Sequence, residues 1–110
     1  MRTSILAGSL IGRKLNTGLS HDIRPTSSRV RQSIFNIIGS IKDEEVLDLY
    51  SGAGTLGFEA ASRGAGSVTF VDNSVEAIDV IQINAKLFPE AILTIVRRDA
   101  EKFLYQSKDY

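Results

Sequence analysis

The sequence lacks cysteine altogether and has a single histidine, His21, among its 110 residues. Without thiols there can be no disulfide framework, no thiolate metal site and no cysteine nucleophile, and one histidine cannot form a histidine cluster. The sequence therefore predicts neither redox nor zinc chemistry. His21 stands in a polar stretch and is expected to be solvated.

Long hydrophobic runs are missing as well. The longest candidate for a membrane or signal segment, residues 5–11, is interrupted by Gly8 and Ser9 and is followed by Arg13 and Lys14. It is too short to span a bilayer, which takes about 20 apolar residues, and it lacks the cleavage pattern of a signal peptide. We therefore expect no membrane partner and a cytoplasmic location.

The chain as a whole has no excess of either charge, but its two parts do. Residues 1–42 carry seven basic residues and one acid, a net charge of +6, and residues 43–110 carry the compensating −6. A chain of this length fits one domain at most. The charge division indicates two regions with different roles, a basic N-terminal extension (residues 1–42) and an acidic remainder (residues 43–110).

The basic extension contains signals for a hairpin and a helix. Residues 2–6 and 10–15 are short β-compatible runs on either side of a glycine-containing turn, which predicts a β-hairpin. Further on, Thr26 or Ser27 can cap a helix that Gly39 ends. Its apolar residues recur at three- and four-residue spacing, which predicts one apolar stripe with the polar residues turned away: the stripe is Val30, Ile34, Ile37, Ile38 and Ile41, and the polar residues are Arg29, Gln32, Ser33 and Asn36.

The acidic remainder alternates strand and helix signals. Strands are predicted at residues 46–50, 67–71 and 92–96, and helices at 56–63, at 75–85 and after Asp99. Asn73 with Glu76, and Asp99, are expected to cap the later helices. This order predicts an α/β fold with a parallel sheet. Because three strands make a narrow sheet, we expect the chain to be the front part of a larger domain.

The candidate site lies beyond the strand ends, where open parallel sheets bind their ligands. Asp48, Asp72 and Asp99 stand at the ends of the three predicted strands, and residues 52–57 (GAGTLG) form a GxGxxG string before a helix. Glycines allow the backbone to approach a ligand closely, and the first amides of a helix favour a negative group. A glycine-rich turn without any ligand remains an alternative.

Two ligand classes fit this string. A dinucleotide would place its pyrophosphate at the helix start and its ribose on an acid about 20 residues further on, and Asp72 follows Gly52 by 20 residues. Asp48, however, stands four residues before Gly52 and would repel a pyrophosphate. A carboxylate there suits the ammonium group of S-adenosylmethionine, which is the ligand we favour.

The same residues carry a family resemblance. Residues 46–57 (VLDLYSGAGTLG) resemble the first motif of class I S-adenosylmethionine-dependent methyltransferases, and residues 70–72 (FVD) resemble the second. More particularly, the chain resembles bacterial RsmD-type enzymes, which methylate a guanine N2 amino group in small-subunit ribosomal RNA, at residues 12–15 (GRKL), 24–26 (RPT), 29–31 (RVR), 34–37 (IFNI) and 57–65 (GFEAASRGA). The likeness covers nearly the whole chain. It implies a Rossmann-like class I methyltransferase fold with a truncated parallel sheet, preceded by a β-hairpin and helix extension.

The resemblance also implies roles for individual residues. Asp48 addresses the methionine amino group, Asp72 holds the ribose hydroxyls with Asn73 beside it, and Asp99 and Ala100 meet the adenine edge. The methionine and sulfonium end is lined by the backbone of Tyr50, Ser51, Gly52, Ala53 and Gly54. Asn73 and Asp99 have an alternative interpretation as plain helix caps, and Gly57 as a residue that allows close helix–strand packing.

The implied partner is ribosomal RNA or the small ribosomal subunit. The residues predicted to form a phosphate-binding face are Arg13, Lys14, Arg24, Arg29 and Arg31. A solvated charged surface is the alternative for this cluster. Two other functions stay open for the chain, a fragment of an NAD-binding oxidoreductase and a non-catalytic nucleotide- or RNA-binding domain.

Members of the family carry an Asn/Asp-Pro-Pro-aromatic motif that grips the target amine, and these 110 residues contain no such string. Guanine N2 is a poor nucleophile, so its positioning has to supply much of the catalysis. We therefore expect the chain to be inactive by itself, and no catalytic residue is assigned. The first strand is also expected to present an unpaired edge through which copies of the chain can associate.

Overall fold

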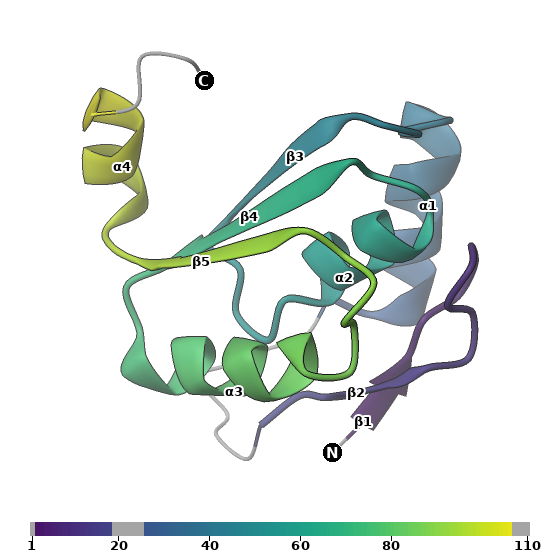
Figure 1. Ribbon diagram of the computed structural model, residues 1–110, viewed down its shortest axis with the longest axis horizontal. Helices are drawn as coiled ribbons and strands as arrows, with labels where there is room; N and C mark the ends of the chain where they lie inside the picture. Colours follow the sequence, from purple (N-terminus) through teal and green to yellow (C-terminus); the bar gives the residue numbers. More distant parts are fainter. Residues whose placement is uncertain (1, 19–25, 107–110) are drawn as a thin grey trace.

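Three parallel strands form the central sheet of the structure, a computed structural model that describes residues 2–18 and 26–106. The strands β3 (Glu45–Leu49), β4 (Ser67–Asp72) and β5 (Leu93–Arg97) lie in the order β3-β4-β5. Their register pairs Asp48 with Phe70 and Asp72 with Arg97, which brings the carboxyl ends of the strands to one edge (Figure 1). The predicted parallel sheet is confirmed, and each strand lies within one residue of its predicted range.

Helices follow the strands in alternation. The helix α2 (Thr55–Ser62) joins β3 to β4, α3 (Val75–Ala85) joins β4 to β5, and α4 (Ala100–Gln106) follows β5. The first of these packs on β3 and β4, and the second packs on β5. In the view of Figure 1, α1 and α2 lie behind the sheet, and among the described residues no helix covers most of the near face.

Phenylalanine rings fill the space between the sheet and the helices. The ring of Phe58 on α2 lies 4.7 Å from that of Phe70 on β4 and 4.7 Å from that of Phe88, which follows α3. All three are buried, as is Phe35. The packing is close enough that a Cβ added at Gly57 would lie 2.2 Å from the Phe70 ring. These phenylalanines are thus part of the hydrophobic core, and Gly57 does allow α2 to approach the sheet.

The N-terminal hairpin is shorter than predicted. Its strands β1 (Arg2–Ser4) and β2 (Lys14–Asn16) are antiparallel, with Thr3 paired to Leu15. Backbone pairing continues only through Ile5, which donates to the Arg13 carbonyl and accepts from the Gly12 amide, both at 2.9 Å, and amides of the turn donate to side chains of α2. Leu6 and Ala7 donate to the carboxylate of Glu59 at 3.0 and 3.1 Å, and Leu10 donates to the hydroxyl of Ser62 at 3.0 Å.

The helix of the extension, α1 (Ser28–Ile38), begins and ends where the sequence predicts. Ser27 caps its start by accepting a hydrogen bond from the Val30 amide at 3.2 Å. Gly39 ends it with a φ of 78°, a left-handed value that favours glycine. The polar residues Gln32 and Asn36 are exposed and hydrogen-bonded to each other at 2.9 Å.

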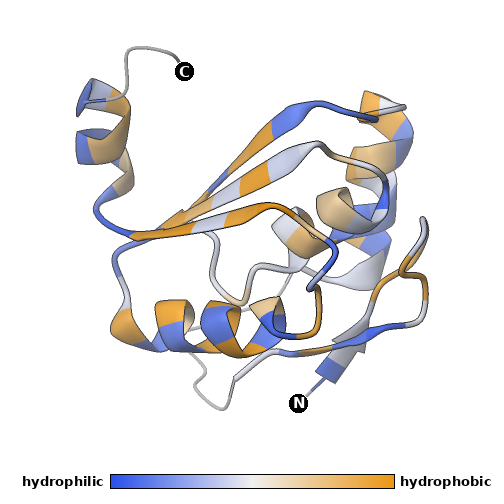
Figure 2. Ribbon diagram, in the orientation of Figure 1, coloured by the Kyte–Doolittle hydropathy of each residue, from blue (hydrophilic) through white to orange (hydrophobic). Residues whose placement is uncertain are grey.

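The buried face of α1 matches the predicted apolar stripe only in part. Ile34 is half-buried, and Ile41, beyond the helix end, is buried, but Val30, Ile37 and Ile38 are 50%, 85% and 56% exposed, and the helix buries Arg31 and Phe35 instead. The reason is electrostatic: the helix packs against a buried carboxylate on α2, and a guanidinium group has to face it. As a result, several hydrophobic residues of α1 face solvent. Figure 2 shows hydrophobic residues, in orange, both in α1 and in the central strands.

Candidate ligand-binding site at the strand ends

The glycine-rich turn between β3 and α2 is held in one shape by its own backbone and by Ser51. Tyr50, Gly52 and Gly54 have left-handed φ values of 54°, 57° and 83°. The Ser51 hydroxyl accepts from the Val71 amide at 3.0 Å, and the Ser51 amide donates to the Val71 carbonyl at 3.1 Å. These bonds fix the turn against the end of β4.

Asp72, at the end of β4, bridges this turn to the start of α3. Its Oδ2 accepts from the Gly52 amide at 3.0 Å, and its Oδ1 accepts from the Ser74 amide at 2.9 Å. The carboxylate is partly exposed and retains acceptor capacity for a ligand.

The cap of α3 differs from the prediction. Ser74 is the N-cap, and its hydroxyl accepts from the Ala77 amide at 3.2 Å. Asn73 is exposed, and its carbonyl accepts from the Arg97 side chain at 3.3 Å. The helix starts one residue later than the Asn73 and Glu76 pair implies because Asp72 already turns the chain through its bond to the Ser74 amide. Asn73 is thus beside Asp72 without being the cap.

Asp48 lies at the base of the turn and is 8% exposed. Its Oδ2 accepts from the Gly57 amide in the first turn of α2 at 3.1 Å. Burial raises the pKa of Asp48 to about 7; the Gly57 amide lowers it in part, and the charge of Asp72 raises it further. A second negative group is therefore unfavourable here, and a cation is favourable.

Asp99 and Ala100 follow β5. Asp99 is exposed, and its Oδ1 accepts from the Lys102 amide at 3.1 Å, which makes it a cap of α4 as predicted. Ala100 is buried. Contact of either residue with adenine remains a prediction.

Those basic residues of the extension that the structure describes do not form one continuous face. Lys14 and Arg29 are exposed. Arg13 lies over the ring of Phe88, 5.6 Å from its centre, and pairs with Glu90 at 3.1 Å, an interaction that lowers the pKa of Glu90. Arg24 lies outside the described residues.

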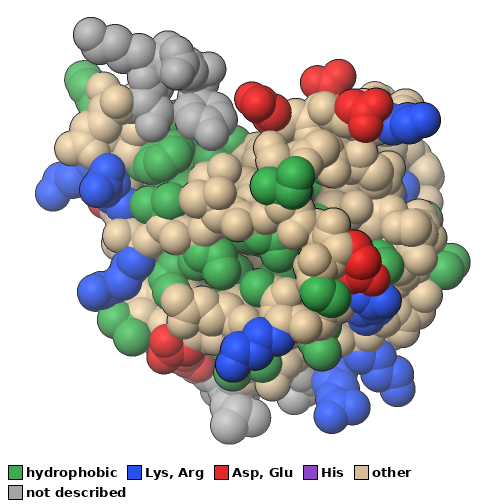
Figure 3. All heavy atoms as spheres, viewed as in Figure 1, with side chains coloured by type: hydrophobic (Ala, Val, Ile, Leu, Met, Phe, Trp, Pro, Cys, Tyr) green, Lys and Arg blue, Asp and Glu red, His purple; other side chains and the backbone are tan. Residues whose placement is uncertain are grey.

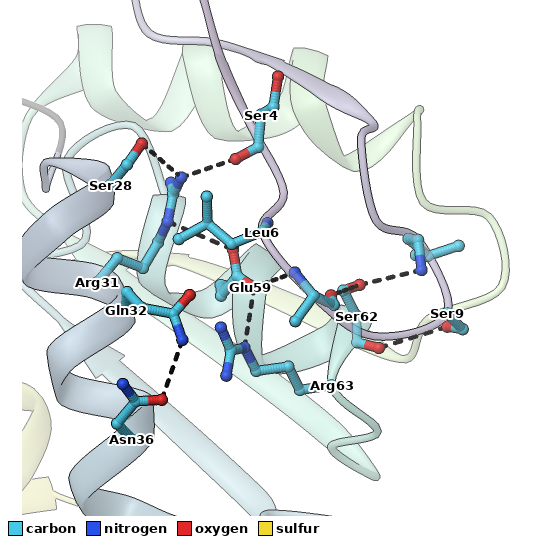
Figure 4. A network of polar contacts seen from close by, with 12 residues as sticks. Ser4, Leu6, Ser9, Ser28, Arg31, Gln32, Asn36, Glu59, Ser62 and Arg63 are labelled. Atoms are coloured by element: carbon cyan, nitrogen blue, oxygen red, sulfur yellow. Dashed lines mark hydrogen bonds and ion pairs between the residues drawn. The ribbon is translucent and has the colours of Figure 1, made fainter.

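Arg31 is the clearest correction to the predicted phosphate-binding face. Its side chain is fully buried, with Nε 3.3 Å from Oε1 of Glu59, and its Nη2 donates to the carbonyl of Ser4 at 2.7 Å. Figure 4 shows Arg31 and Arg63 pointing to Glu59 from different elements. Because Arg31 is enclosed by the protein, it cannot contact an RNA phosphate in this structure.

The sequence interpretation gave no role to several buried polar residues, of which Glu59 and Asn84 make the most contacts with other elements. Glu59 on α2 and Asn84 on α3 are both 0% exposed and both bind the backbone of the extension. Asn84 follows Val80 and Ile81 at the spacing of the buried face of α3, so a polar residue within that stripe was the available signal. In the described ranges, 2–18 and 26–106, no group of three or more potential ligands is placed to hold a metal ion. Nor does any helix in this part of the chain have the length and apolarity to cross a membrane.

Comparisons with known proteins agree with this architecture. The family described as "Conserved hypothetical protein 95" matches residues 3–110. The Ribosomal RNA small subunit methyltransferase D of Escherichia coli K12 is 34% identical over 103 residues, which cover 93% of this chain and 52% of that protein. Its namesake from Haemophilus influenzae is 46% identical over 69 residues, 62% of this chain and 36% of that protein.

A solved structure gives the same result for the fold. A hypothetical protein of Thermus thermophilus matches with a TM-score of 0.82 at 28% identity, over 96% of this chain and 61% of that one. The chain spans about half the length of the Escherichia coli relative, 52% of it.

Proposed function

We propose, because the chain belongs to the family described as "Conserved hypothetical protein 95", that its glycine-rich turn binds S-adenosylmethionine. In this proposal it does so as part of an enzyme that methylates guanine N2 in small-subunit ribosomal RNA. The names of the two methyltransferase relatives, from Escherichia coli and Haemophilus influenzae, support the ribosomal RNA substrate. Guanine N2, and the cytoplasmic location expected from the sequence, stay predictions.

The choice of ligand rests on one observation: amides of the turn and of the start of α2 already donate hydrogen bonds within the protein. The amides of Gly52 and Gly57 donate to carboxylates, those of Asp72 and Asp48 respectively. The Gly54 amide donates to the Ser51 carbonyl at 2.8 Å. A dinucleotide site needs such amides for its pyrophosphate, and here it would meet two carboxylates instead.

The same geometry fits S-adenosylmethionine. Asp72 has free acceptor capacity for the ribose hydroxyls, with Asn73 exposed beside it. The buried carboxylate of Asp48 is the group that an ammonium would stabilise, and Asp99 with Ala100 is proposed for adenine. The backbone of residues 50–54 lines the methionine end. When bound, the cofactor supplies an activated methyl group on a sulfonium.

Equilibrium dialysis of the 110-residue chain against labelled S-adenosylmethionine and NADH tests this proposal. We expect the methyl donor to bind and NADH not to. Asp72→Asn is expected to weaken methyl-donor binding by about tenfold or more, because hydrogen bonds to a charged group contribute about 1.5–3 kcal/mol each. Asp79→Asn, an exposed change of the same charge on α3, is the control. Binding of NADH with equal or greater affinity would favour the oxidoreductase alternative.

The RNA partner is proposed on the exposed part of the basic extension, Lys14 and Arg29. Replacing both by glutamine is expected to reduce the salt dependence of binding to a small-subunit RNA fragment by about 1–2 in the log–log slope. Lys86→Gln, on the exposed end of α3, is the matched control. We also expect no transfer of labelled methyl to the bound RNA, because the amine-gripping motif is absent from these residues. Transfer by the chain alone would contradict that expectation, whereas RNA binding without methyl-donor binding would favour the non-catalytic domain.

We further propose that copies of the chain associate along β3. This strand is at the edge of the described sheet. Beside it lies an apolar hollow of about 200 Å³ between α1, α2 and β3, lined in part by Ile38, Val46 and Leu47.

A further inference from the structure

Asn84 has every polar atom of its side chain engaged, although it is completely buried within α3. Its Oδ1 accepts from the Asn16 amide at 2.8 Å, and its Nδ2 donates to the Asn16 carbonyl at 2.7 Å. The same Nδ2 donates to the carbonyl of Ala53 at 3.2 Å. One side chain thus joins the end of β2 to the middle of the glycine-rich turn.

The turn is wedged against α3 at the same place. The Ala53 side chain is 1% exposed and forms a small buried cluster with Ala77 and Val80 of α3. A Cβ added at Gly18, two residues after Asn16, would lie 3.3 Å from the side chain of Val80. Helix, turn and extension therefore meet around Asn84, and the carbonyl of Ala53 has a fixed direction.

Only an amide side chain satisfies this arrangement. Two carbonyl oxygens need donors and one amide needs an acceptor, and asparagine supplies both from one short side chain. Aspartate would turn a carboxylate oxygen toward the two carbonyls, and leucine would leave all three backbone groups without these partners. The identity of residue 84 is thus set by the turn and the extension and not by α3 itself.

We propose that Asn84 is a positioning residue for the glycine-rich turn, which it couples to the N-terminal extension. This inference rests on the proposed function, because the turn is the surface that would receive the methionine part of S-adenosylmethionine. Loss of the Asn84 amide frees the Ala53 carbonyl and the backbone of Asn16 together. The cofactor surface then loses its preformed shape while the sheet remains.

The test compares Asn84→Ala and Asn84→Ser with Ser62→Ala in the 110-residue chain. Ser62 is the matched control because it is also buried and also ties the extension to a helix, donating to the Ala7 carbonyl and accepting from the Leu10 amide. Affinity for S-adenosylmethionine is measured by calorimetry at a temperature where circular dichroism shows each variant folded. Both Asn84 variants are expected to bind about five- to tenfold more weakly than the wild type, and Ser62→Ala within about twofold.

Amide hydrogen exchange of Ser51, Gly52 and Gly54 is measured without ligand. It therefore reports the order of the turn itself, independently of ligand affinity. Exchange at the turn is expected to accelerate in the Asn84 variants and not in Ser62→Ala. In the wild type, the side-chain amide protons of Asn84 are expected to be protected, which requires no variant to fold. A folded Asn84→Ser with wild-type affinity and exchange would overturn the proposal, as would unprotected Asn84 amide protons. A wild-type chain that does not bind the ligand would refute the proposed function, while the exchange data would still decide the positioning role.

Discussion

At the residue scale, the buried carboxylate of Asp48 is the group for which burial most clearly lowers the stability of the folded state at neutral pH. Burial raises the pKa of Asp48 from its ordinary value of 3.8 to about 7, so the folded state holds this proton more tightly than the unfolded chain does. The unfolded state binds fewer protons between these two values, and stability therefore falls as the pH rises from about 4 to about 7.

Asp48→Asn removes this titration and keeps an oxygen for the Gly57 amide. The unfolding free energy of the variant relative to the wild type is expected to rise by about 3 kcal/mol between about pH 5 and about pH 8, with most of the rise below about pH 7. Urea unfolding at several pH values measures the difference. Asp99→Asn, at an exposed helix cap, serves as the control for the loss of a carboxylate as such. A difference that does not vary with pH would mean that Asp48 is ionised without penalty.

The buried carboxylate of Glu59 is compensated in a way that Asp48 is not. It accepts from the Nε of Arg63 at 2.9 Å and from two backbone amides, and Arg31 lies at 3.3 Å. Burial lowers the pKa of Arg31 and the charge of Glu59 raises it in part. Removing one partner from a buried ion pair costs about 3–5 kcal/mol, because it leaves the other charge uncompensated. The penalty of turning Arg31 away from Glu59 therefore exceeds the gain from burying one more isoleucine, about 1.5–3 kcal/mol.

At the scale of elements, α1 shows where prediction from sequence succeeds and where it fails. Its ends follow from local chemistry, a serine at the N-cap and a glycine with a left-handed φ at the other end. Its orientation does not, because the deciding partner, Glu59, lies on another helix. Periodicity identifies an apolar stripe, but it cannot weigh that stripe against a buried charge elsewhere in the chain.

The candidate site, too, has features that the sequence predicts and features that it does not. The strand ends, the turn and the positions of Asp48 and Asp72 follow from motif and spacing, because neighbouring parallel strands bring their ends together. The partner of Asp48 in α2 and the role of Asn84 depend on contacts between distant elements. The spacing places a carboxylate near the turn but does not predict which backbone amides donate hydrogen bonds to it.

At the scale of the whole molecule, the described sheet is covered on one side and open on the other. Figure 3 shows hydrophobic side chains gathered on the near face, with basic side chains toward its margins. At the β3 edge, Ile37 and Ile38 of α1 are largely exposed beside the apolar hollow. An uncovered apolar face next to an unpaired strand edge is a site at which polypeptides add.

Association of two chains along β3 is therefore expected in solution. Sedimentation equilibrium should show a weight-average mass that rises with concentration, and Leu47→Lys should lower it toward the monomer, because a charge on an edge strand opposes pairing. Thr94→Lys, at an exposed position of β5, is the matched control and should leave the association unchanged. Amide exchange along residues 45–49 should slow as the concentration rises. A monomer at all concentrations, with these amides already protected when dilute, would show that the β3 edge is satisfied within one chain.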